Sequence, residues 1–230
     1  MNSYAHDISS ALSYIHRRRL VHLDVKPANV VVTESDRCKL TDFGCSQRLS
    51  PSDDDAARSS ATVGGRRRPS SPPATFNGTL AYRAPELLRG AAPTAAADVY
   101  SLGVTLWQMR SRWSPYAGRR GGDCMHAVVF AVVAYHDRPD TSPALRRRRI
   151  SSTAVGRTSP PPPAAAAAVG DVGARTPDRR YRNVFRRCWN ASADARPSAV
   201  ELARLFRTWR TELDDGSSTS SLDTDDMDDV

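Results

Sequence analysis

The chain has 230 residues, of which 40% are hydrophobic and 25% charged, and its formal net charge is +8. This length suits one globular domain and excludes an obvious pair of domains. The positive charge alone would suit nucleic acid or acidic lipid, but the arginine runs lack the interleaved aromatic residues on which bases stack.

The sequence predicts neither a secreted nor a membrane protein. Residues 1–10 are polar and lack the apolar stretch of a signal peptide. The longest apolar run, at 127–135, is too short to cross a bilayer. No pair of cysteines has the C-x-x-C spacing of zinc and redox motifs. We expect a soluble cytoplasmic monomer without a nucleic-acid or membrane partner.

A helix and a short hairpin are the first elements predicted along the chain. Apolar residues with helical spacing mark one face of the helix: Tyr4, Ile8, Leu12 and Ile15. β-Branched and apolar runs at 29–32 and 38–41 flank a polar turn, which predicts a β-hairpin. The stretch from about 47 to 73 is rich in Ser, Asp, Arg and Pro, and we expect a long disordered loop there.

The second half of the chain contains the predicted core helix, at 97–110. Its apolar residues cover nearly the whole circumference, which is typical of a buried helix. A second apolar helix is expected at 124–135 and a disordered insertion at about 139–177. The last helix begins at a capping box, 198–201. Its predicted buried stripe is Leu202, Phe206, Trp209 and Leu213. The acidic tail, 214–230, is expected to be disordered.

The segments HLDVKPAN (22–29) and DFG (42–44) hold side chains that suit phosphoryl transfer. This reaction needs a carboxylate for the proton of the attacking hydroxyl, oxygen ligands for Mg²⁺ and a cation for the phosphate. The two segments supply all of these groups: Asp24, Asn29, Asp42 and Lys26.

Local geometry predicts that these groups lie together. Pro27 fixes its own φ and biases Lys26 away from a helix, so the turn can bring Asp24 and Asn29 to one side. The hairpin that follows would then fold Asp42 back beside Asp24.

The order of three motifs resembles the eukaryotic protein kinases. H-x-D-x-K-P-x-N, D-F-G and G-T-x-x-Y-x-A-P-E occur in sequence at 22–29, 42–44 and 78–86. The Lys-Pro after Asp24 and the pair Gly78-Thr79 are typical of the serine/threonine branch. The resemblance implies a mainly α large lobe over residues 1–213, with a short β-hairpin at the active site.

Several longer stretches are similar to the Mos family of these kinases, among them VHLDVKPAN, CKLTDFGCS, SLGVTLWQM and RCWNASADARPS. This resemblance implies a cytoplasmic serine/threonine kinase of germ cells that uses ATP and Mg²⁺. Mos kinases act as MAP kinase kinase kinases in a pathway that arrests oocyte meiosis, so the implied protein substrate is a MAP kinase kinase.

The resemblance also implies roles for single residues at the active site. Asp24 would be the catalytic base, and Lys26 would contact the γ-phosphate. Asn29 and Asp42 would hold the Mg²⁺ ions. Val31 would lie beneath the adenine. The implied ATP site therefore consists of Lys26, Asn29, Val31 and Asp42.

Other positions would support the site. Thr79 would hydrogen-bond Asp24 and Lys26, and so tie the substrate loop to the catalytic segment. His22 and Phe43 would stack in the internal spine of the active form. The remaining implied contacts are structural: Glu86 would pair with Arg196, and Asp98 would bind the backbone of the catalytic segment.

Two features depart from the family pattern. Leu23 stands where most kinases have an arginine that grips a phosphate on the activation loop, so we expect activity that does not depend on that phosphate. The second is that no Gly-rich loop and no V-A-I-K lysine precede the catalytic segment in these 230 residues. We therefore expect a fold without the small lobe, and little or no activity from this chain alone.

Two alternatives to a truncated kinase remain open. The chain could be a non-catalytic binding module that sequesters a kinase partner through its substrate-docking helices. It could instead be a kinase-like phosphotransferase for small molecules, although the A-P-E motif and the core helix with Asp98 disfavour that reading.

Overall fold

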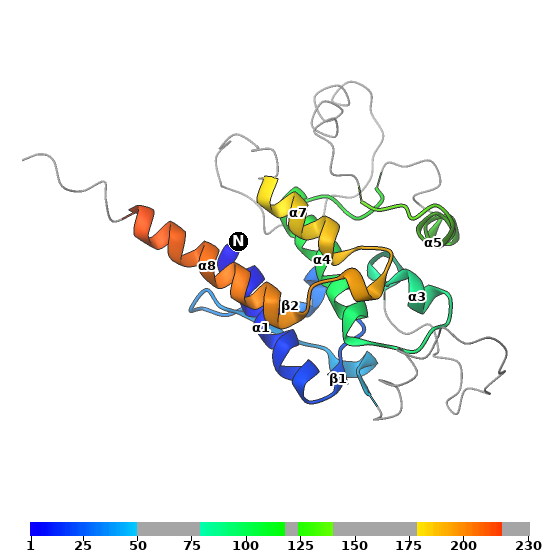
Figure 1. Ribbon diagram of the computed structural model, residues 1–230, viewed down its shortest axis with the longest axis horizontal. Helices are drawn as coiled ribbons and strands as arrows, with labels where there is room; N and C mark the ends of the chain where they lie inside the picture. The colour runs from blue at the N-terminus through cyan, green and yellow to red at the C-terminus, as the bar shows by residue number, and fades with distance from the viewer. Residues whose placement is uncertain (50–78, 118–123, 140–178, 218–230) are drawn as a thin grey trace, which may run out of the picture.

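The computed structural model describes residues 1–49, 79–117, 124–139 and 179–217, with side chains up to 212. Helices surround one central helix, beside two short antiparallel strand pairs (Figure 1). The helices and strands are α1 (Asn2–Arg17), β1 (Leu20–Val21), β2 (Val30–Val32), β3 (Cys38–Leu40), β4 (Gln47–Arg48), α3 (Pro85–Leu88), α4 (Ala95–Ser111), α5 (Met125–Ala134), α7 (Arg179–Cys188) and α8 (Ala199–Ser217). The 3₁₀ turns are η1 (Pro27–Asn29), η2 (Phe43–Cys45), η3 (Leu80–Tyr82) and η4 (Ala193–Ala195).

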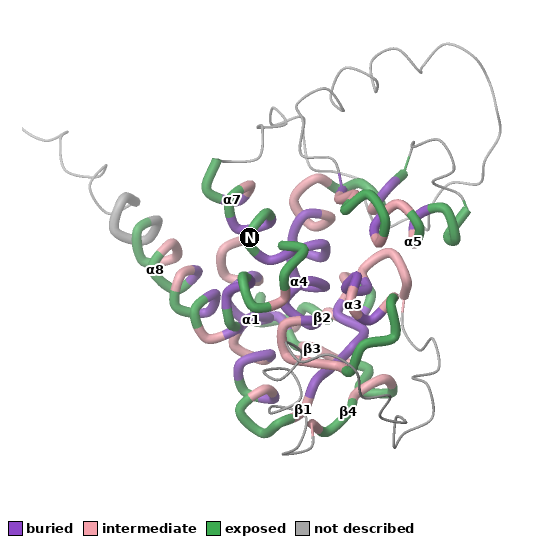
Figure 2. The backbone as a smooth tube through the Cα atoms, turned by 45° about the vertical axis from the view of Figure 1, so that its right-hand side comes forward, coloured by how far each residue is buried: buried purple, intermediate pink, exposed green. Residues whose placement is uncertain are grey.

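The predicted core helix is confirmed as α4. Every residue from Ala97 to Trp107 is buried, and Figure 2 shows this stretch in purple at the centre of the fold. A helix with apolar side chains on all sides can pack in every direction, which explains its central place. None of the helices that the structure describes is long and apolar enough to cross a membrane.

Helices α1 and α8 pack along each other on one side of this core. On α1, three of the predicted apolar positions are buried: Ile8, Leu12 and Ile15. On α8, two are buried: Leu202 and Phe206. Tyr4 and Trp209 are half-buried, and Leu213 lies beyond the described side chains. The predicted capping box is confirmed, because the N–H of Ser198 donates to Glu201 Oε2 at 2.7 Å and the N–H of Glu201 donates to Ser198 Oγ at 3.3 Å.

The structure shifts two predicted boundaries. Gln47–Arg48, expected at the start of a loop, form β4 and pair with β1. A two-residue polar strand has no apolar alternation that a sequence could reveal. Helix α8 runs to Ser217, past the expected start of the tail. Most of the predicted loop, the insertion and the rest of the tail lie outside the described residues.

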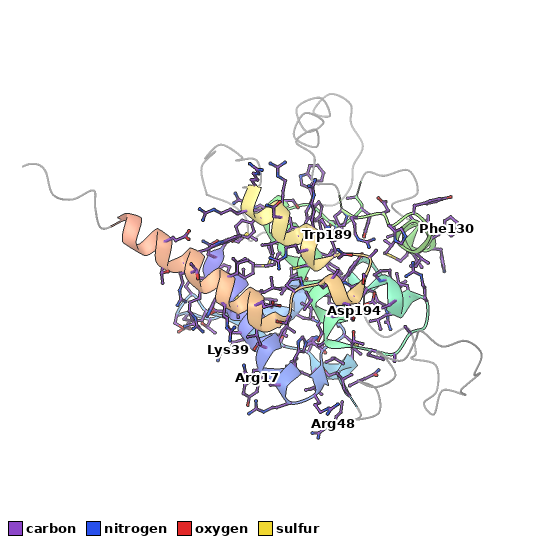
Figure 3. The ribbon with its side chains drawn as sticks, viewed as in Figure 1. Arg17, Lys39, Arg48, Phe130, Trp189 and Asp194 are labelled. Carbon is purple, nitrogen blue, oxygen red and sulfur yellow. The ribbon has the colours of Figure 1, made fainter. Side chains whose placement is uncertain are left out.

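Helix α5 is apolar as predicted, but it is not a core helix. Val128 and Val132 are its buried residues, and they pack in a small separate cluster with Tyr116. Phe130 is 60% exposed, at the edge of the molecule in Figure 3, and Tyr135 is 73% exposed. The apolar run therefore predicted the helix and not its burial.

Gly103 allows α4 and α7 to approach closely. A Cβ added at this position would lie 2.6 Å from the Cβ of Cys188. Gly→Ala inside a helix would otherwise stabilise by roughly 0.5–1 kcal/mol. We expect the opposite sign here, because overpacking costs about 1–3 kcal/mol. Urea unfolding of Gly103→Ala tests this. The destabilisation by Gly103→Ala should be smaller in a Cys188→Gly variant, which lacks the clashing Cβ. Equal destabilisation in both backgrounds would contradict the clash.

Candidate active site

Asp98 on α4 anchors the segment 22–29. Its carboxylate is fully buried and accepts hydrogen bonds from the backbone N–H groups of His22 and Leu23, each at 2.8 Å. It also lies 2.8 Å from His16 Nε2. Leu23 has a φ of 65°, a conformation that costs energy for a residue with a side chain. The predicted contact between Asp98 and this backbone is therefore present, and it holds a strained turn.

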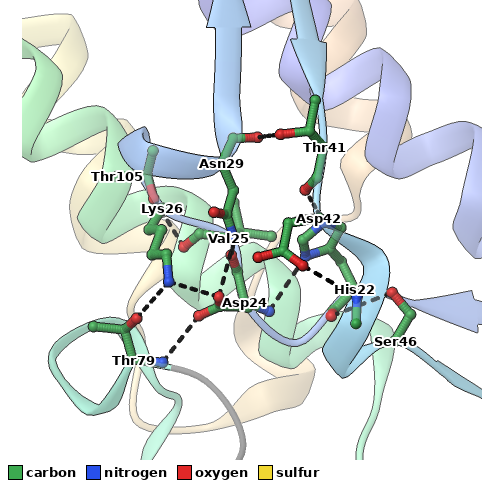
Figure 4. Close-up of polar contacts among 11 residues, drawn as sticks. His22, Asp24, Val25, Lys26, Asn29, Thr41, Asp42, Ser46, Thr79 and Thr105 are labelled. Carbon is green, nitrogen blue, oxygen red and sulfur yellow. Dashed lines mark hydrogen bonds and ion pairs between the residues drawn. The ribbon is translucent and has the colours of Figure 1, made fainter.

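Three donors surround the Asp24 carboxylate (Figure 4). Lys26 Nζ donates to Asp24 Oδ2 at 2.7 Å, and Asn29 Nδ2 donates to the same oxygen at 2.9 Å. The backbone N–H of Thr79 donates to Oδ1 at 2.9 Å. Lys26 Nζ also donates to the Thr79 hydroxyl at 2.8 Å. The predicted link from Thr79 to Asp24 and Lys26 is thus present.

Burial and hydrogen bonding act in opposite directions on the pKa of Asp24. Burial raises the pKa of this carboxyl, but the bonds from Lys26, Thr79 and Asn29 favour the carboxylate and together outweigh burial. The pKa of Asp24 therefore lies below its ordinary value. At neutral pH the side chain is an ionised but weak base, suited to orienting a hydroxyl proton.

The predicted hairpin is present as β2–β3, and it returns the chain to Asn29 at the residue before Asp42. The carbonyl of Asn29 accepts hydrogen bonds from the Thr41 backbone N–H at 2.9 Å and from the Thr41 hydroxyl at 3.1 Å. Asp42 is the next residue and has a φ of 61°. Its carboxylate is exposed, and Oδ1 accepts from the Gly44 N–H at 3.3 Å.

The oxygen atoms of Asn29 and Asp42 fit a magnesium ion. Asn29 directs its Nδ2 at Asp24, which leaves its amide oxygen for another partner. Mg²⁺ prefers such oxygens and takes its remaining ligands from phosphates and water. No group of three or more His, Cys, Asp or Glu side chains suits a metal within the described ranges, so an ion here would need those outside ligands.

His22 is fixed at both ring nitrogens. Nε2 lies 3.0 Å from the Thr41 carbonyl, and Nδ1 accepts the backbone N–H of Asp24 at 3.3 Å. These partners place the proton on Nε2, because a carbonyl can only accept. The Phe43 ring meets the imidazole edge to face at 4.9 Å between centroids, so the predicted pair is in contact but the rings are not stacked. Phe43 and Val31 remain 45% and 49% exposed, and the place of Val31 beneath adenine stays a prediction.

Two polar residues that carry no motif also support the site. The hydroxyl of Thr105 on α4 lies 3.1 Å from the carbonyl of Val25. Asp7 is buried on α1 and accepts two hydrogen bonds from Arg37, at 2.9 and 2.8 Å, and one from the Cys38 N–H at 3.0 Å. Asp7 therefore pins the hairpin to α1. A carboxylate beside the apolar helix face was its only sequence signal.

An Asp7→Asn variant is expected to lose about 1.5–3 kcal/mol of stability at pH 7. Burial raises the pKa of Asp7, but Arg37 and the Cys38 N–H outweigh it and lower the pKa overall. A lowered pKa contributes stability above the unfolded value near 3.9 and loses it as pH falls through the folded value. The difference in free energy of unfolding between Asp7→Asn and the unchanged chain should therefore become smaller at acidic pH. Urea unfolding at several pH values tests this, with the exposed Glu34→Gln as control; a difference constant with pH would contradict it.

The predicted Glu86–Arg196 pair is present and bidentate. Arg196 donates to the two carboxylate oxygens of Glu86 at 2.6 and 2.8 Å, and to the carbonyls of Ala96 and Asn190 at 3.0 and 2.9 Å. The Arg196 side chain is fully buried. This pair joins α3, which follows the substrate loop, to the chain before α8.

Comparison with known proteins identifies the family of the chain. The protein kinase domain model matches residues 1–205. The chain is 40% identical to the serine/threonine-protein kinase mos of Patiria pectinifera, over 91% of this chain and 47% of that protein. It is 38% identical to the same kinase of Xenopus laevis, over 86% and 44%, and 35% identical to the proto-oncogene kinase mos of Sus scrofa, over 91% and 47%. The chain spans about half the length of these relatives. It has Mos serine/threonine kinases as homologues and belongs to the protein kinase family.

Proposed function

We propose that the chain is the large lobe of a Mos-type serine/threonine kinase, which transfers the γ-phosphate of ATP to a protein hydroxyl. The observation that carries this proposal is the Asp24 carboxylate, held by Lys26, Asn29 and Thr79 beside the end of the hairpin that bears Asp42. Its homology to Mos kinases supports the narrower identity.

The residues have distinct tasks in this proposal. Asp24 accepts a hydrogen bond from the substrate hydroxyl and so aims its oxygen at the γ-phosphate. Lys26 balances charge on that phosphate while it stays bonded to Asp24. Thr79 holds the substrate loop against both. Protein kinases generally use ATP and Mg²⁺, and Mg²⁺ when bound neutralises phosphate charge; Asn29 and Asp42 would hold it.

The substrate and setting follow from the Mos homology. We assign a MAP kinase kinase as the protein substrate, which makes the kinase a MAP kinase kinase kinase. The proposed setting is the cytoplasm of oocytes, where the pathway arrests meiosis. We propose that the kinase is a monomer, because Asp24, Lys26 and Thr79 contact one another within one chain.

The 230 residues alone should have little or no activity. They include no Gly-rich loop and no V-A-I-K lysine before the catalytic segment. Val31, which we propose to lie beneath adenine, is half exposed, and so is Phe43. The exposed site favours one alternative, a binding module that sequesters a kinase partner. On the substrate side, Ser101 on α4 donates to the carbonyl of Tyr82 at 2.8 Å, which holds η3 against the core helix.

A chimera tests the proposal. The small lobe of the Patiria pectinifera Mos kinase is joined ahead of residue 1, and transfer of labelled γ-phosphate to a MAP kinase kinase is measured. The chimera should phosphorylate this substrate, and the 230-residue chain should not. Robust transfer by the chain alone, lost in Asp24→Ala, would contradict the inactivity. A folded but inactive chimera that still captures the MAP kinase kinase would favour the binding module.

Phosphatase treatment of the chimera is expected to leave its activity unchanged. Leu23 is buried and cannot bind a phosphate on the activation loop, so no phosphate is needed there to order the site. Activity is measured before and after treatment, with loss of labelled phosphate as proof of removal. Loss of activity together with loss of phosphate would refute this expectation.

A further inference from the structure

One face of α7 carries an unusual density of arginines. The buried residues of this helix are Tyr181, Val184, Phe185 and Cys188. The opposite side holds what we call the α7 arginine face: Arg179, Arg182, Arg186 and Arg187. These four side chains are exposed or half-exposed, and none of them makes an ion pair or a side-chain hydrogen bond with any part of the chain that the structure describes.

This charge pattern opposes helix formation. Arg179 and Arg182 lie three residues apart and Arg182 and Arg186 four, spacings at which like charges repel. Two arginines also occupy the first turn, where the helix dipole disfavours cations, and that turn itself contains no acidic residue. An anionic partner on this face would relieve both conflicts.

The chain carries an anionic segment close to this face. Arg180 on α7 donates to Glu212 on α8 at 2.6 Å, so the start of α7 lies beside the last turns of α8. Ser217, where α8 ends, is five residues further, about 7.5 Å along the helix. The residues that follow, 218–230, include five aspartates and no basic residue.

We propose that the acidic segment 218–230 binds the α7 arginine face of the same chain. Thirteen residues can span about 43 Å, whereas α7 is about 15 Å long, so the segment reaches the whole face. Single exposed ion pairs are weak. Tethering compensates for this, because a short linker gives an effective concentration in the millimolar range. In its bound state the segment shields the arginines from other acidic partners.

Helix α8 provides a matched control surface. Arg204, Arg207 and Arg210 form a stripe along it, and these side chains also lack ion pairs within the described residues. They have the same chemistry as the α7 arginine face. Charge alone would let the acidic segment bind either surface. The first turn of α7 contains arginines and no acidic residue, whereas the first turn of α8 contains Glu201, so α7 gains more from an anionic partner.

The experiment uses the full 230-residue chain and a fluorescent synthetic peptide of residues 218–230, at low salt. In one chain variant the five aspartates of the segment are changed to asparagine: Asp223→Asn, Asp225→Asn, Asp226→Asn, Asp228→Asn and Asp229→Asn. This variant should bind the peptide at least tenfold more tightly than the unchanged chain, whose own segment occupies the face. Adding Arg179→Gln, Arg182→Gln and Arg186→Gln should abolish binding. The corresponding triple change in α8 should not.

Several outcomes would overturn the proposal. Equal peptide binding by the unchanged and Asp→Asn chains would show that the segment does not occupy the face. If the α8 changes abolish peptide binding and the α7 changes do not, the segment binds α8 and the proposal is wrong. A concentration-dependent dimer in sedimentation, lost in the Asp→Asn chain, would show binding between two copies. Arg→Lys changes in α7 keep the charge and should retain binding, which separates charge from folding.

Discussion

A Glu86→Ala variant is expected to lose about 3–5 kcal/mol of stability, because it leaves the guanidinium of Arg196 buried without its counter-charge. Arg196 is fully buried, whereas Glu86 is 19% exposed. The free energy of unfolding of a native protein is only about 5–15 kcal/mol, so this loss is a large part of the total stability. It should also loosen the link between the end of the substrate loop and the chain before α8.

The surroundings of Arg196 suit a guanidinium better than an ammonium group. The guanidinium meets two carboxylate oxygens and two backbone carbonyls. It also lies 5.1 Å from the ring centre of Tyr100, and Arg138 lies at the same distance from that ring. An ammonium group cannot make the bidentate contact with Glu86. Arg196→Lys should therefore be clearly destabilising, although it keeps the charge.

Urea unfolding measures the free energy for three variants at position 86 and one control. Glu86→Gln keeps an oxygen acceptor for Arg196 and should cost less than Glu86→Ala. The exposed Glu34→Ala, which has no partner within the described residues, should change stability by less than about 0.5 kcal/mol. A loss for Glu86→Ala no larger than that of Glu34→Ala would refute the proposed role. Glu86→Asp shortens the side chain and should fall between the other two.

Local sequence patterns predicted the parts of the site that depend on short offsets. The turn from Asp24 to Asn29 and the hairpin that carries Asp42 need only a few residues each, and both are present in the structure. The helix at α4 was equally clear, because apolar residues on all sides require burial.

Contacts between residues far apart in the sequence could be predicted only from the resemblance to kinases. The bonds of Asp98 to the backbone of His22 and Leu23 span more than seventy residues, and only the kinase resemblance indicated them. Asp7 and Arg37 carry no family motif, so their ion pair was not foreseen. Periodicity describes which face of an element is apolar, and it does not identify the partner of that face.

The second large effect is expected at Asp24. In the chimera, Asp24→Asn should lower kcat by roughly 10²–10⁴ and change the KM for ATP little, because the amide cannot orient the hydroxyl proton. The amide also brings an N–H₂ group into a site that holds three donors, from Lys26, Asn29 and Thr79. At least one of those hydrogen bonds must break.

Controls separate the loss of the base from a loss of structure. Asp194→Asn changes an exposed carboxylate on η4, labelled in Figure 3, and should retain full activity. Thr79→Val removes the hydroxyl that Lys26 binds but keeps the backbone N–H to Asp24, so its effect should be smaller. If Asp24→Asn keeps activity within a factor of ten of the unchanged chimera while folding normally, Asp24 is not the base.

The pH profile gives an independent readout for the same residue. The bonds to Asp24 outweigh burial and lower its pKa, so its carboxylate stays ionised well below neutral pH. Protonation of Asp24 should therefore produce no acid limb in kcat/KM between pH 5.5 and 8, a range that lies above the usual value of about 3.9. Lys26→Met removes one of the donors that lower this pKa, so the acid limb should move to higher pH in that variant. If the acid limb of kcat/KM lies at the same pH in Lys26→Met as in the unchanged chimera, Lys26 does not set the ionisation of the base.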